Sequence, residues 1–392
     1  MTISLGTSFR HRPADRSLAA ARSLFELYGI RRLVDLTRLD RVGVPVFAAV
    51  RPQGRTLAVH AGKGVTYDEA AASAAMEAIE FAVAERRPPD TIPMSATEAD
   101  YDVLSFCPRL GVEIGRDETL PSIVATSVAD GSPHPVPLSS VFLGDGVTQR
   151  YFGSNTTGLA SGNDVAEATL HGLFEVIERD TKSFQAVNDT TRLVSPESLP
   201  THLQATGDAI EAAGLQYSLR YVVGPVPVPW FRAVIWDPLV DDPCLVNGGY
   251  GCHCDPSIAA MRAVLEAVQS RLVTIHGGRD DLAETYSRFE GLGTTGRRRH
   301  VGRVLRVARR GANAIDFAEI ASLDATLDVD NAIVATVSAA NAAGLRHVLR
   351  YVYEVPTTDL AVVRIVVPGA ENFTVAEGKV GRRLLSHLRR QH

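Results

Sequence analysis

Residues 163–180 constrain the fold of this chain most, because they are typical of one amphipathic helix with an acidic face. At about 100° per residue, Glu167, Glu175 and Glu178 fall within one narrow arc, while most of the apolar residues lie elsewhere. We expect the helix to begin near Asn163, whose side-chain oxygen is suited to cap its first free amides. Stacked carboxylates repel one another, so a cation should compensate them, and Mg²⁺ is the natural candidate.

A second stretch, residues 68–87, repeats this pattern. Ser73, Glu77 and Glu80 stand at positions i, i+4 and i+7 and therefore share one helical face, with alanines at the packing positions between them. The chain thus contains two predicted acidic helix faces.

A third predicted helix spans residues 256–273 and adds cations to the carboxylates. Arg262, Glu266 and Gln269 lie on one side, Arg271 is close by, and an Arg-Asp-Asp sequence at 279–281 follows the Gly277-Gly278 break. Oxygen ligands mixed with guanidinium and amide groups suit Mg²⁺ that bridges nucleotide phosphates better than they suit zinc. This chemistry indicates an ATP-dependent protein.

Each candidate residue also has a structural interpretation. For a single helix, the glutamates fit an exposed face of ion pairs, and an N-cap role alone would account for Asn163. His171 lies on the acidic face, where a structural hydrogen bond is favoured over catalysis. The Cys-His-Cys sequence at 252–254 invites a zinc interpretation, but a packed loop is favoured because these ligands are so few.

The composition is that of a folded, water-soluble protein. The 392 residues are 45% hydrophobic and 22% charged, with a mean hydropathy of +0.02. The net charge of -5 argues against nucleic acid as the primary partner, because binding to duplexes depends on Lys and Arg that neutralise phosphates. No apolar run reaches about 18 residues and no secretory signal is present, so we expect a cytoplasmic protein without a membrane segment, with its four cysteines reduced.

A flexible Gly-Lys-Gly turn at 62–64 precedes the second acidic helix and carries a cation that is able to approach phosphate. It is not a Walker A loop, because the required spacing of glycine, lysine and hydroxyl residue is absent from the whole chain. Further along, a hairpin is predicted over residues 123–137 with its turn at Asp130-Gly131.

Taken together, the three patterns resemble the YcaO family of ATP-dependent enzymes that activate peptide backbone amides. The resemblance rests on three ordered motifs: Ser73-x3-Glu77-x2-Glu80; Asn163-x3-Glu167-x7-Glu175-x2-Glu178-Arg179-Asp180; and Glu266-Ala-Val-Gln269-Ser-Arg271 with residues 279–281. In one departure, Glu80 is followed by Phe81 where many members have arginine, so Lys63 or Arg10 would have to supply that cation.

The resemblance implies an α/β (α+β) YcaO-type fold, in which mixed sheets and packed helices form a nucleotide site. Residues 1–58 are expected to form an N-terminal segment packed on the core, and residues 59–392 the catalytic domain. The implied cofactors are ATP and Mg²⁺. The expected metal ligands are Glu77, Glu80, Glu167, Glu175 and Glu178. The expected nucleotide-binding residues are Lys63, Ser73, Asn163, Arg179, Gln269 and Arg271. The motifs identify no catalytic residue.

The implied reaction adds a nucleophile to a peptide carbonyl, phosphorylates the resulting oxyanion and expels phosphate. A Cys, Ser or Thr side chain would give an azoline, sulfide a thioamide, and an amine an amidine. The chain lacks the Pro-x-Pro-x-Pro tail of many azoline-forming members, and its opening resembles members paired with a TfuA protein, which are associated with thioamides. Thioamide formation is therefore favoured. The expected partners are a precursor peptide, a TfuA-like or other peptide-recognition protein, and a second copy of the chain in a homodimer.

Two other classes of protein remain as alternatives. One is a non-catalytic YcaO-like scaffold that binds nucleotide, and the other is a Mg²⁺-dependent hydrolase of phosphate esters. ATP turnover that rises with a peptide substrate distinguishes the expected enzyme from both.

Overall fold

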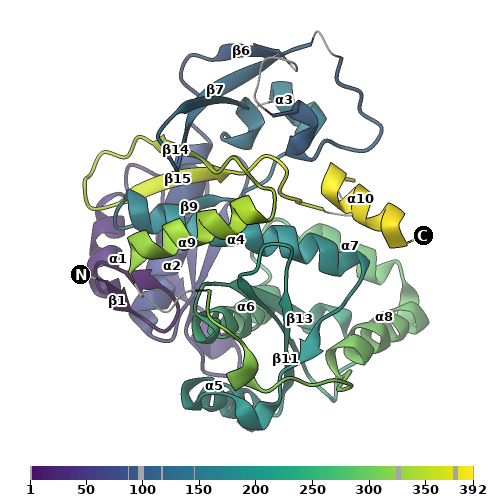
Figure 1. The fold of residues 1–392 in the computed structure, drawn as a ribbon. Helices are drawn as coiled ribbons and strands as arrows, with labels where there is room; N and C mark the ends of the chain where they lie inside the picture. Colours follow the sequence, from purple (N-terminus) through teal and green to yellow (C-terminus); the bar gives the residue numbers. More distant parts are fainter. Residues whose placement is uncertain are drawn as a thin grey trace.

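The computed structural model describes residues 2–86, 88–95, 101–115, 118–144, 146–323, 328–373 and 378–391. Three strand–helix units carry the three sequence motifs (Figure 1). In each unit a strand ends three or four residues before a long helix begins. The units are β5 (Val59–Lys63) with α2 (Tyr67–Ala84), β9 (Leu159–Gly162) with α4 (Val165–Val187), and β13 (Asn247–Cys252) with α6 (Pro256–His276).

Each unit belongs to a different antiparallel sheet. The first has the order β3-β4-β5, with β3 (Arg32–Asp35) and β4 (Val46–Val50). The second has the order β6-β7-β14-β15-β9, with β8 paired to β7; its further strands are β6 (Ile92–Ser95), β7 (Thr119–Ser127), β8 (Pro133–Pro137), β14 (Leu349–Tyr353) and β15 (Ala361–Val366). The third has the order β10-β11-β12-β13, with β10 (Arg192–Leu193), β11 (Gln216–Val223) and β12 (Pro229–Trp236).

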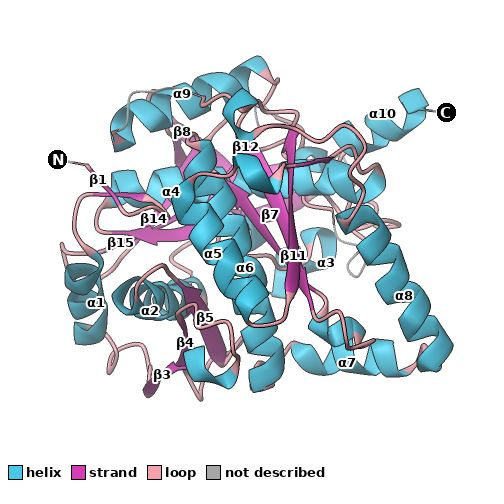
Figure 2. Ribbon diagram, turned by 90° about the horizontal axis from the view of Figure 1, so that it is seen from below, coloured by secondary structure: helices cyan, strands magenta, loops and turns pink. Residues whose placement is uncertain are grey.

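The remaining elements surround these units. A two-stranded hairpin opens the chain, and the other helices lie around the sheets (Figures 1 and 2). They are β1 (Ile3–Ser4), β2 (Phe9–Arg10), α1 (Ala14–Ser23), α3 (Gly146–Phe152), α5 (Thr201–Ala212), α7 (Leu282–Glu290), α8 (Gly293–Ala308), α9 (Val329–Ala342) and α10 (Arg382–Gln391).

Glycines allow the helices to approach their strands closely. A Cβ atom on Gly62 would lie 2.0 Å from the backbone nitrogen of Ala74 on α2, and one on Gly251 would lie 2.0 Å from the carbonyl oxygen of Ala259 on α6. Because any side chain here would meet backbone, glycine is required for this packing. The helix faces that carry the motifs are thereby held close to the sheets (Figure 2).

Three large apolar clusters form the core. One joins α1 and α2 to strands of the first two sheets, a second joins α5 and α6 to β11 and β12, and a third joins α4 to α9 and β15. The alanines of α2 are small enough for close packing on both sides of that helix.

The mixed α/β architecture predicted from the sequence is confirmed, and so is the hairpin between β7 and β8 with a turn at Gly131. The predicted start of α4 near Asn163 is confirmed to within two residues, because the helix begins at Val165. The predicted cap is wrong: the Asp164 side chain is the N-cap and accepts a hydrogen bond from the Glu167 amide. Asn163 therefore does not cap the helix. The third helix extends to His276 and ends at Gly277, which has a φ of 68°. Within the described residues, no helix is long and apolar enough to cross a membrane.

Candidate functional site

A cavity of about 390 Å³ lies between α2, α4, α6 and the N-terminal residues. All but two of the residues predicted to bind nucleotide or metal line its wall. They are Lys63, Ser73, Glu77, Glu80, Asn163, Glu175, Glu178, Arg179 and Gln269. Motifs up to about 200 residues apart in the sequence are therefore brought to one cavity.

The position of each side chain follows from its strand–helix unit. On α2, Glu77 and Glu80 are half-buried one turn apart. Glu80 accepts a hydrogen bond from the Ser161 hydroxyl at the end of β9, which links the first two units. On α6, Gln269 donates a hydrogen bond to the carbonyl oxygen of Ala61 on β5 at 2.8 Å, which links the first unit to the third.

The carboxyl groups of this cavity are held in an unfavourable environment for negative charge. Burial raises the pKa of Glu77 to about 7, and burial together with the charge of Glu266 raises the pKa of Glu178 to about 7. Burial also raises the pKa of Glu175, and it raises that of Glu80 well above the ordinary value for a glutamate. The cations near these four carboxyl groups are therefore too few to offset the effect of burial on their pKa values.

Cations occupy part of the same wall. Nζ of Lys63 lies 2.9 Å from Oε2 of Glu266. Despite burial, this ammonium together with the charges of Arg179 and Lys182 lowers the pKa of Glu266 to about 2. Nη2 of Arg179 lies 3.6 Å from Oε1 of Glu175, one turn away on α4. The site therefore combines fixed positive groups with carboxyl groups that have no full counter-charge, which suits a ligand containing both anionic and cationic parts.

These residues fit Mg²⁺ together with a nucleotide. A divalent cation would supply the missing positive charge beside the carboxyl groups with raised pKa values. Among the described residues, the predicted metal ligands other than Glu167 do not bring three ligand atoms within reach of one another. This spread agrees with the usual binding of Mg²⁺ by one or two carboxylates together with phosphate oxygens, rather than by a complete protein cage.

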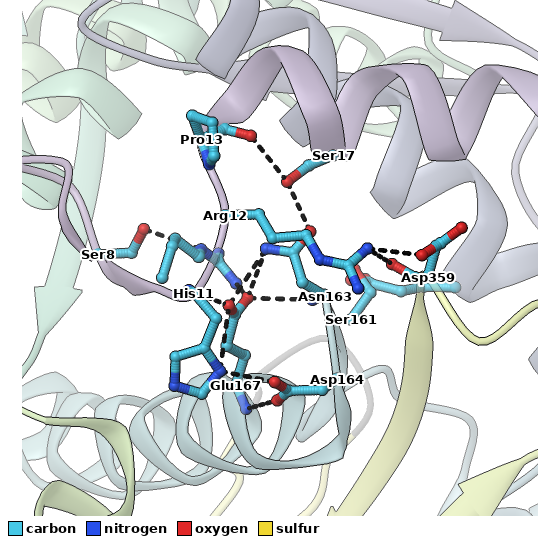
Figure 3. A network of polar contacts seen from close by, with 12 residues as sticks. Ser8, His11, Arg12, Pro13, Ser17, Ser161, Asn163, Asp164, Glu167 and Asp359 are labelled. Carbon is cyan, nitrogen blue, oxygen red and sulfur yellow. Dashed lines mark hydrogen bonds and ion pairs between the residues drawn. The ribbon is translucent and has the colours of Figure 1, made fainter. Parts of the chain in front are cut away.

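Glu167, predicted to be a metal ligand, does not line the cavity. Its buried carboxylate accepts hydrogen bonds from the amide and side-chain nitrogens of Asn163, from the backbone amide of His11 and from Arg10 at 3.2 Å (Figure 3). These donors occupy both oxygens. In this structure Glu167 therefore positions Asn163 and the N-terminal residues, and its predicted role as a metal ligand stays a prediction.

Residues 5–13, here called the N-terminal strap, contribute to the wall of the cavity. Polar contacts tie this strap to the core, and Figure 3 shows those of His11 and Arg12. Nδ1 of His11 lies 2.6 Å from Oδ2 of Asp164, and Arg12 forms a 2.8 Å ion pair with Asp359. His11, Asp164 and Glu167 lie close enough together to be considered as metal ligands. Their mutual hydrogen bonds and those of the strap already account for the cluster, so we interpret it as an anchor of the strap.

Arg271, predicted to bind nucleotide, also lies outside the cavity wall. It is buried, and its Nε forms a 2.7 Å ion pair with Asp40, which is itself buried at the side chain. The i+2 spacing from Gln269 explains this outcome, because two residues advance a helix by about 200° and so place Arg271 on another face.

Several residues of the cavity wall were absent from the predicted site. Arg262 and Glu266 lie on the predicted face of α6, so their spacing from Gln269 was a sufficient signal. Arg279 follows the break after that helix, and its charge lowers the pKa of Glu77 against the larger effect of burial. The strap residues had no signal in their local sequence, apart from the basic charge of Arg10.

The remaining histidine motifs have structural partners. Nε2 of His171 lies 3.3 Å from Nη2 of Arg262, as expected for a structural hydrogen bond, although His171 also lines the cavity. The ring of His253 packs against Phe9 and Phe174, with both centroids 4.6 Å away. In the part of the chain that is described, residues 252–254 belong to no group of metal-ligating side chains, which favours the packed loop.

A cavity of carboxyl and guanidinium groups between three strand–helix units is typical of a protein that binds a nucleotide with a divalent metal. The chain belongs to the YcaO family: the family model described as YcaO cyclodehydratase, ATP- and Mg²⁺-binding, matches residues 61–371. The predicted family is confirmed, and so are the predicted cofactors, ATP and Mg²⁺, which are those of the family.

Relatives match most of the chain. An uncharacterised protein of Methanothermobacter thermautotrophicus is 34% identical over 96% of this chain and 98% of its own length. A Rhizobium leguminosarum bv. trifolii protein, described as uncharacterised and in the tfuA 3′ region, is 32% identical over 91% of this chain and 87% of its own.

Solved structures share the fold. YcaO from Methanopyrus kandleri bound with AMPPCP and Mg²⁺ has a TM-score of 0.77 and 24% identity, covering 96% of both chains. A heterocyclase in complex with substrate and cofactor also has a TM-score of 0.77, with 17% identity over 97% of this chain and 55% of its own. These matches confirm the predicted YcaO-type fold.

Proposed function

We propose that this chain activates a peptide backbone amide by ATP- and Mg²⁺-dependent O-phosphorylation, and that it forms a thioamide in a ribosomally made peptide together with a TfuA-like partner. The observation that carries the proposal is the cavity in which Glu77 and Glu178, both with pKa values raised to about 7, face the cations of Lys63 and Arg179. The location of the Rhizobium relative in the tfuA 3′ region supports the TfuA-like partner and the thioamide.

The cavity residues divide into two groups by chemistry. The carboxyl groups of Glu77, Glu80, Glu175 and Glu178 would hold Mg²⁺, and the other predicted residues of the wall would hold the nucleotide: Lys63, Ser73, Asn163, Arg179 and Gln269. When bound, ATP supplies the phosphoryl group and Mg²⁺ neutralises part of its charge.

The chain's own residues position these groups. Ser161 and Gln269 join the strand–helix units on opposite sides of the cavity, so that carboxyl groups from different helices keep their separation. Lys63 keeps Glu266 ionised, and Arg179 directs a permanent positive charge at the same space. Positioning and charge neutralisation are the main contributions a protein makes to phosphoryl transfer.

Two alternative reactions use the same site. Attack by a substrate Cys, Ser or Thr would give an azoline, and attack by an amine would give a macroamidine. The heterocyclase and the E. coli microcin synthetase McbBCD complex with pro-MccB17 bound, which share the fold, keep the first alternative open. A non-catalytic nucleotide-binding scaffold is less favoured, because it does not need a cavity with this many carboxyl groups.

The remaining parts of the proposal concern partners and organisation. We propose that the substrate is a precursor peptide recognised with the help of a partner protein, and that two copies of the chain form a homodimer. We also propose residues 59–392 as the catalytic domain; the family model begins at residue 61.

The test measures ATP consumption with Mg²⁺ by the purified protein, Glu77→Gln and Glu178→Gln, with and without sulfide and a TfuA-like protein. Arg389→Gln is the control, because this exposed residue lies outside the cavity. Turnover should be lost in both glutamine variants and retained in the control. Peptide mass then separates the products, since a thioamide replaces oxygen with sulfur while an azoline or a macroamidine loses water. Tight nucleotide binding without turnover under any of these conditions would favour the scaffold.

A further inference from the structure

A second cavity, of about 690 Å³, lies at the far end of α4 from Asn163. Its wall is made by the last turns of α4, the connection between β11 and β12, and α10, which is the yellow helix near the C-terminus in Figure 1. This volume is within the range of clefts that hold ligands of considerable size.

The charge of this cavity is one-sided. Arg382, Arg383, His387 and Arg390 line it, and none of the described residues that line it is acidic. The whole chain, in contrast, has a net charge of -5. A local excess of positive charge attracts an anionic partner over distances of about 10 Å at moderate ionic strength.

The arginines differ in how far they are neutralised. Arg382 pairs with Asp102 and Arg383 with Asp180, each at 2.5 Å. Arg390 is exposed, and within the described ranges it has no ion pair. Apolar surface lies beside these charges, since Phe184 and the 58% exposed Val223 also line the cavity. The cavity therefore suits a ligand that has both carboxylate and apolar side chains.

A seam of half-buried residues runs along α4 between this cavity and the nucleotide cavity. Between residues 171 and 185, five side chains are half-buried and every side chain between them is buried. Their spacing of four, four, three and three residues places them on one helix face. They are His171, Glu175, Arg179, Lys182 and Gln185.

The seam has one member between the two cavities. Arg179 lines the nucleotide cavity and Gln185 lines the second cavity, so Lys182 alone separates them along α4. Six helical residues advance about 9 Å, a distance that about three residues of extended peptide cover. Lys182 lies over the ring of Tyr250, with Nζ 4.0 Å from the centroid, which holds its ammonium beside the seam.

We propose that the second cavity binds an acidic segment of the precursor peptide, and that the peptide follows the α4 seam past Lys182 to present its reacting amide at the nucleotide cavity. This inference rests on the proposed function. It assigns part of peptide recognition to the chain itself, in a second cavity whose lining residues are separate from those that hold nucleotide and metal.

The test uses a fluorescein-labelled ten-residue peptide that alternates glutamate with alanine, and a lysine–alanine peptide as its counterpart. Fluorescence anisotropy at low salt should show the acidic peptide binding at least about tenfold more tightly than the basic one. Arg390→Glu and Lys182→Ala should each weaken the acidic peptide about fivefold or more. Arg389→Glu is the matched control, because this neighbouring arginine is exposed and does not line the cavity.

The affinity for AMPPCP with Mg²⁺ is measured on the same proteins, and it should be unchanged in Arg390→Glu. Equal binding of the two peptides, or equal losses in Arg390→Glu and Arg389→Glu, would overturn the proposed peptide site. Absence of AMPPCP binding in the parent protein would instead contradict the proposed function, so the two failures are distinguishable.

Discussion

The ammonium of Lys63, at the end of β5, lies 2.9 Å from the carboxylate of Glu266, in the middle of α6. The two residues are 203 positions apart in the sequence. Their pair joins the first strand–helix unit to the third across the nucleotide cavity, and it keeps Glu266 ionised among carboxyl groups whose pKa values are raised.

Lys63→Met should weaken the binding of AMPPCP with Mg²⁺ about tenfold, or ~1.4 kcal/mol. The substitution keeps the length of the side chain but removes a positive charge that faces the phosphates in the proposed function. Isothermal titration calorimetry measures the affinity, with Arg389→Met as a control that removes an exposed charge outside the cavity. Equal affinities of parent and Lys63→Met would remove Lys63 from the site.

Glu167→Gln and Glu178→Gln should separate a positioning role from metal binding. Glu167 accepts hydrogen bonds from Asn163 and the strap, so Glu167→Gln should lower the free energy of unfolding by about 1.5–3 kcal/mol. The Mg²⁺ concentration at which nucleotide binding is half-maximal should be the same in Glu167→Gln as in the parent. Glu178→Gln should raise that concentration at least about tenfold. Urea unfolding and a Mg²⁺ titration give the two readouts. A raised Mg²⁺ requirement in Glu167→Gln would support the predicted role of Glu167 as a metal ligand.

Arg271→Met should destabilise the fold without changing the nucleotide site. Removal of this guanidinium leaves Asp40 buried and unpaired, which costs about 3–5 kcal/mol. The double variant with Asp40→Leu should recover part of that stability, because it removes the unpaired charge as well. The affinity of both variants for AMPPCP, measured under conditions where the proteins are folded, should equal that of the parent. A tenfold loss of affinity in both variants would show that Arg271 acts on the nucleotide.

His60 should make the protein less stable in acid. Burial lowers the pKa of His60 to about 3, whereas the unfolded chain has a histidine pKa of about 6.5. Below pH 6.5 the unfolded state binds a proton that the folded state does not, so the free energy of unfolding falls as pH decreases from about 6.5 towards 3. Relative to His60→Gln, the parent should lose about 1 kcal/mol more between pH 6.5 and pH 5.5.

Urea unfolding at the two pH values measures this difference, and the exposed His202→Gln variant is its control. A pH dependence that is the same in the parent and in His60→Gln would contradict the prediction.

The local periodicity of the sequence was enough to predict the helices that form the site and most of the residues that these helices direct into the cavity. Glu77 and Glu80, or Glu175 and Glu178, share a face because helix geometry alone relates residues three or four positions apart. The hairpin of β7 and β8 could also be predicted from the sequence, because its turn residues determine the local backbone conformation over only a few positions. The family resemblance, which is confirmed, predicted ATP and Mg²⁺ as the ligands from the same spacings.

Only the tertiary structure decided which of these side chains line one cavity and which form hydrogen bonds or ion pairs with other residues instead. Glu167 and Arg271 have the side chains expected in their motifs. Glu167, however, accepts hydrogen bonds from Asn163 and the strap, and Arg271 forms an ion pair with Asp40. The strap lies far from Glu167 in the sequence, and Asp40 lies far from Arg271, so periodicity along one helix cannot report either contact. The packing of the three strand–helix units brings those partners together, because glycines such as Gly62 allow each helix to lie directly against its strand.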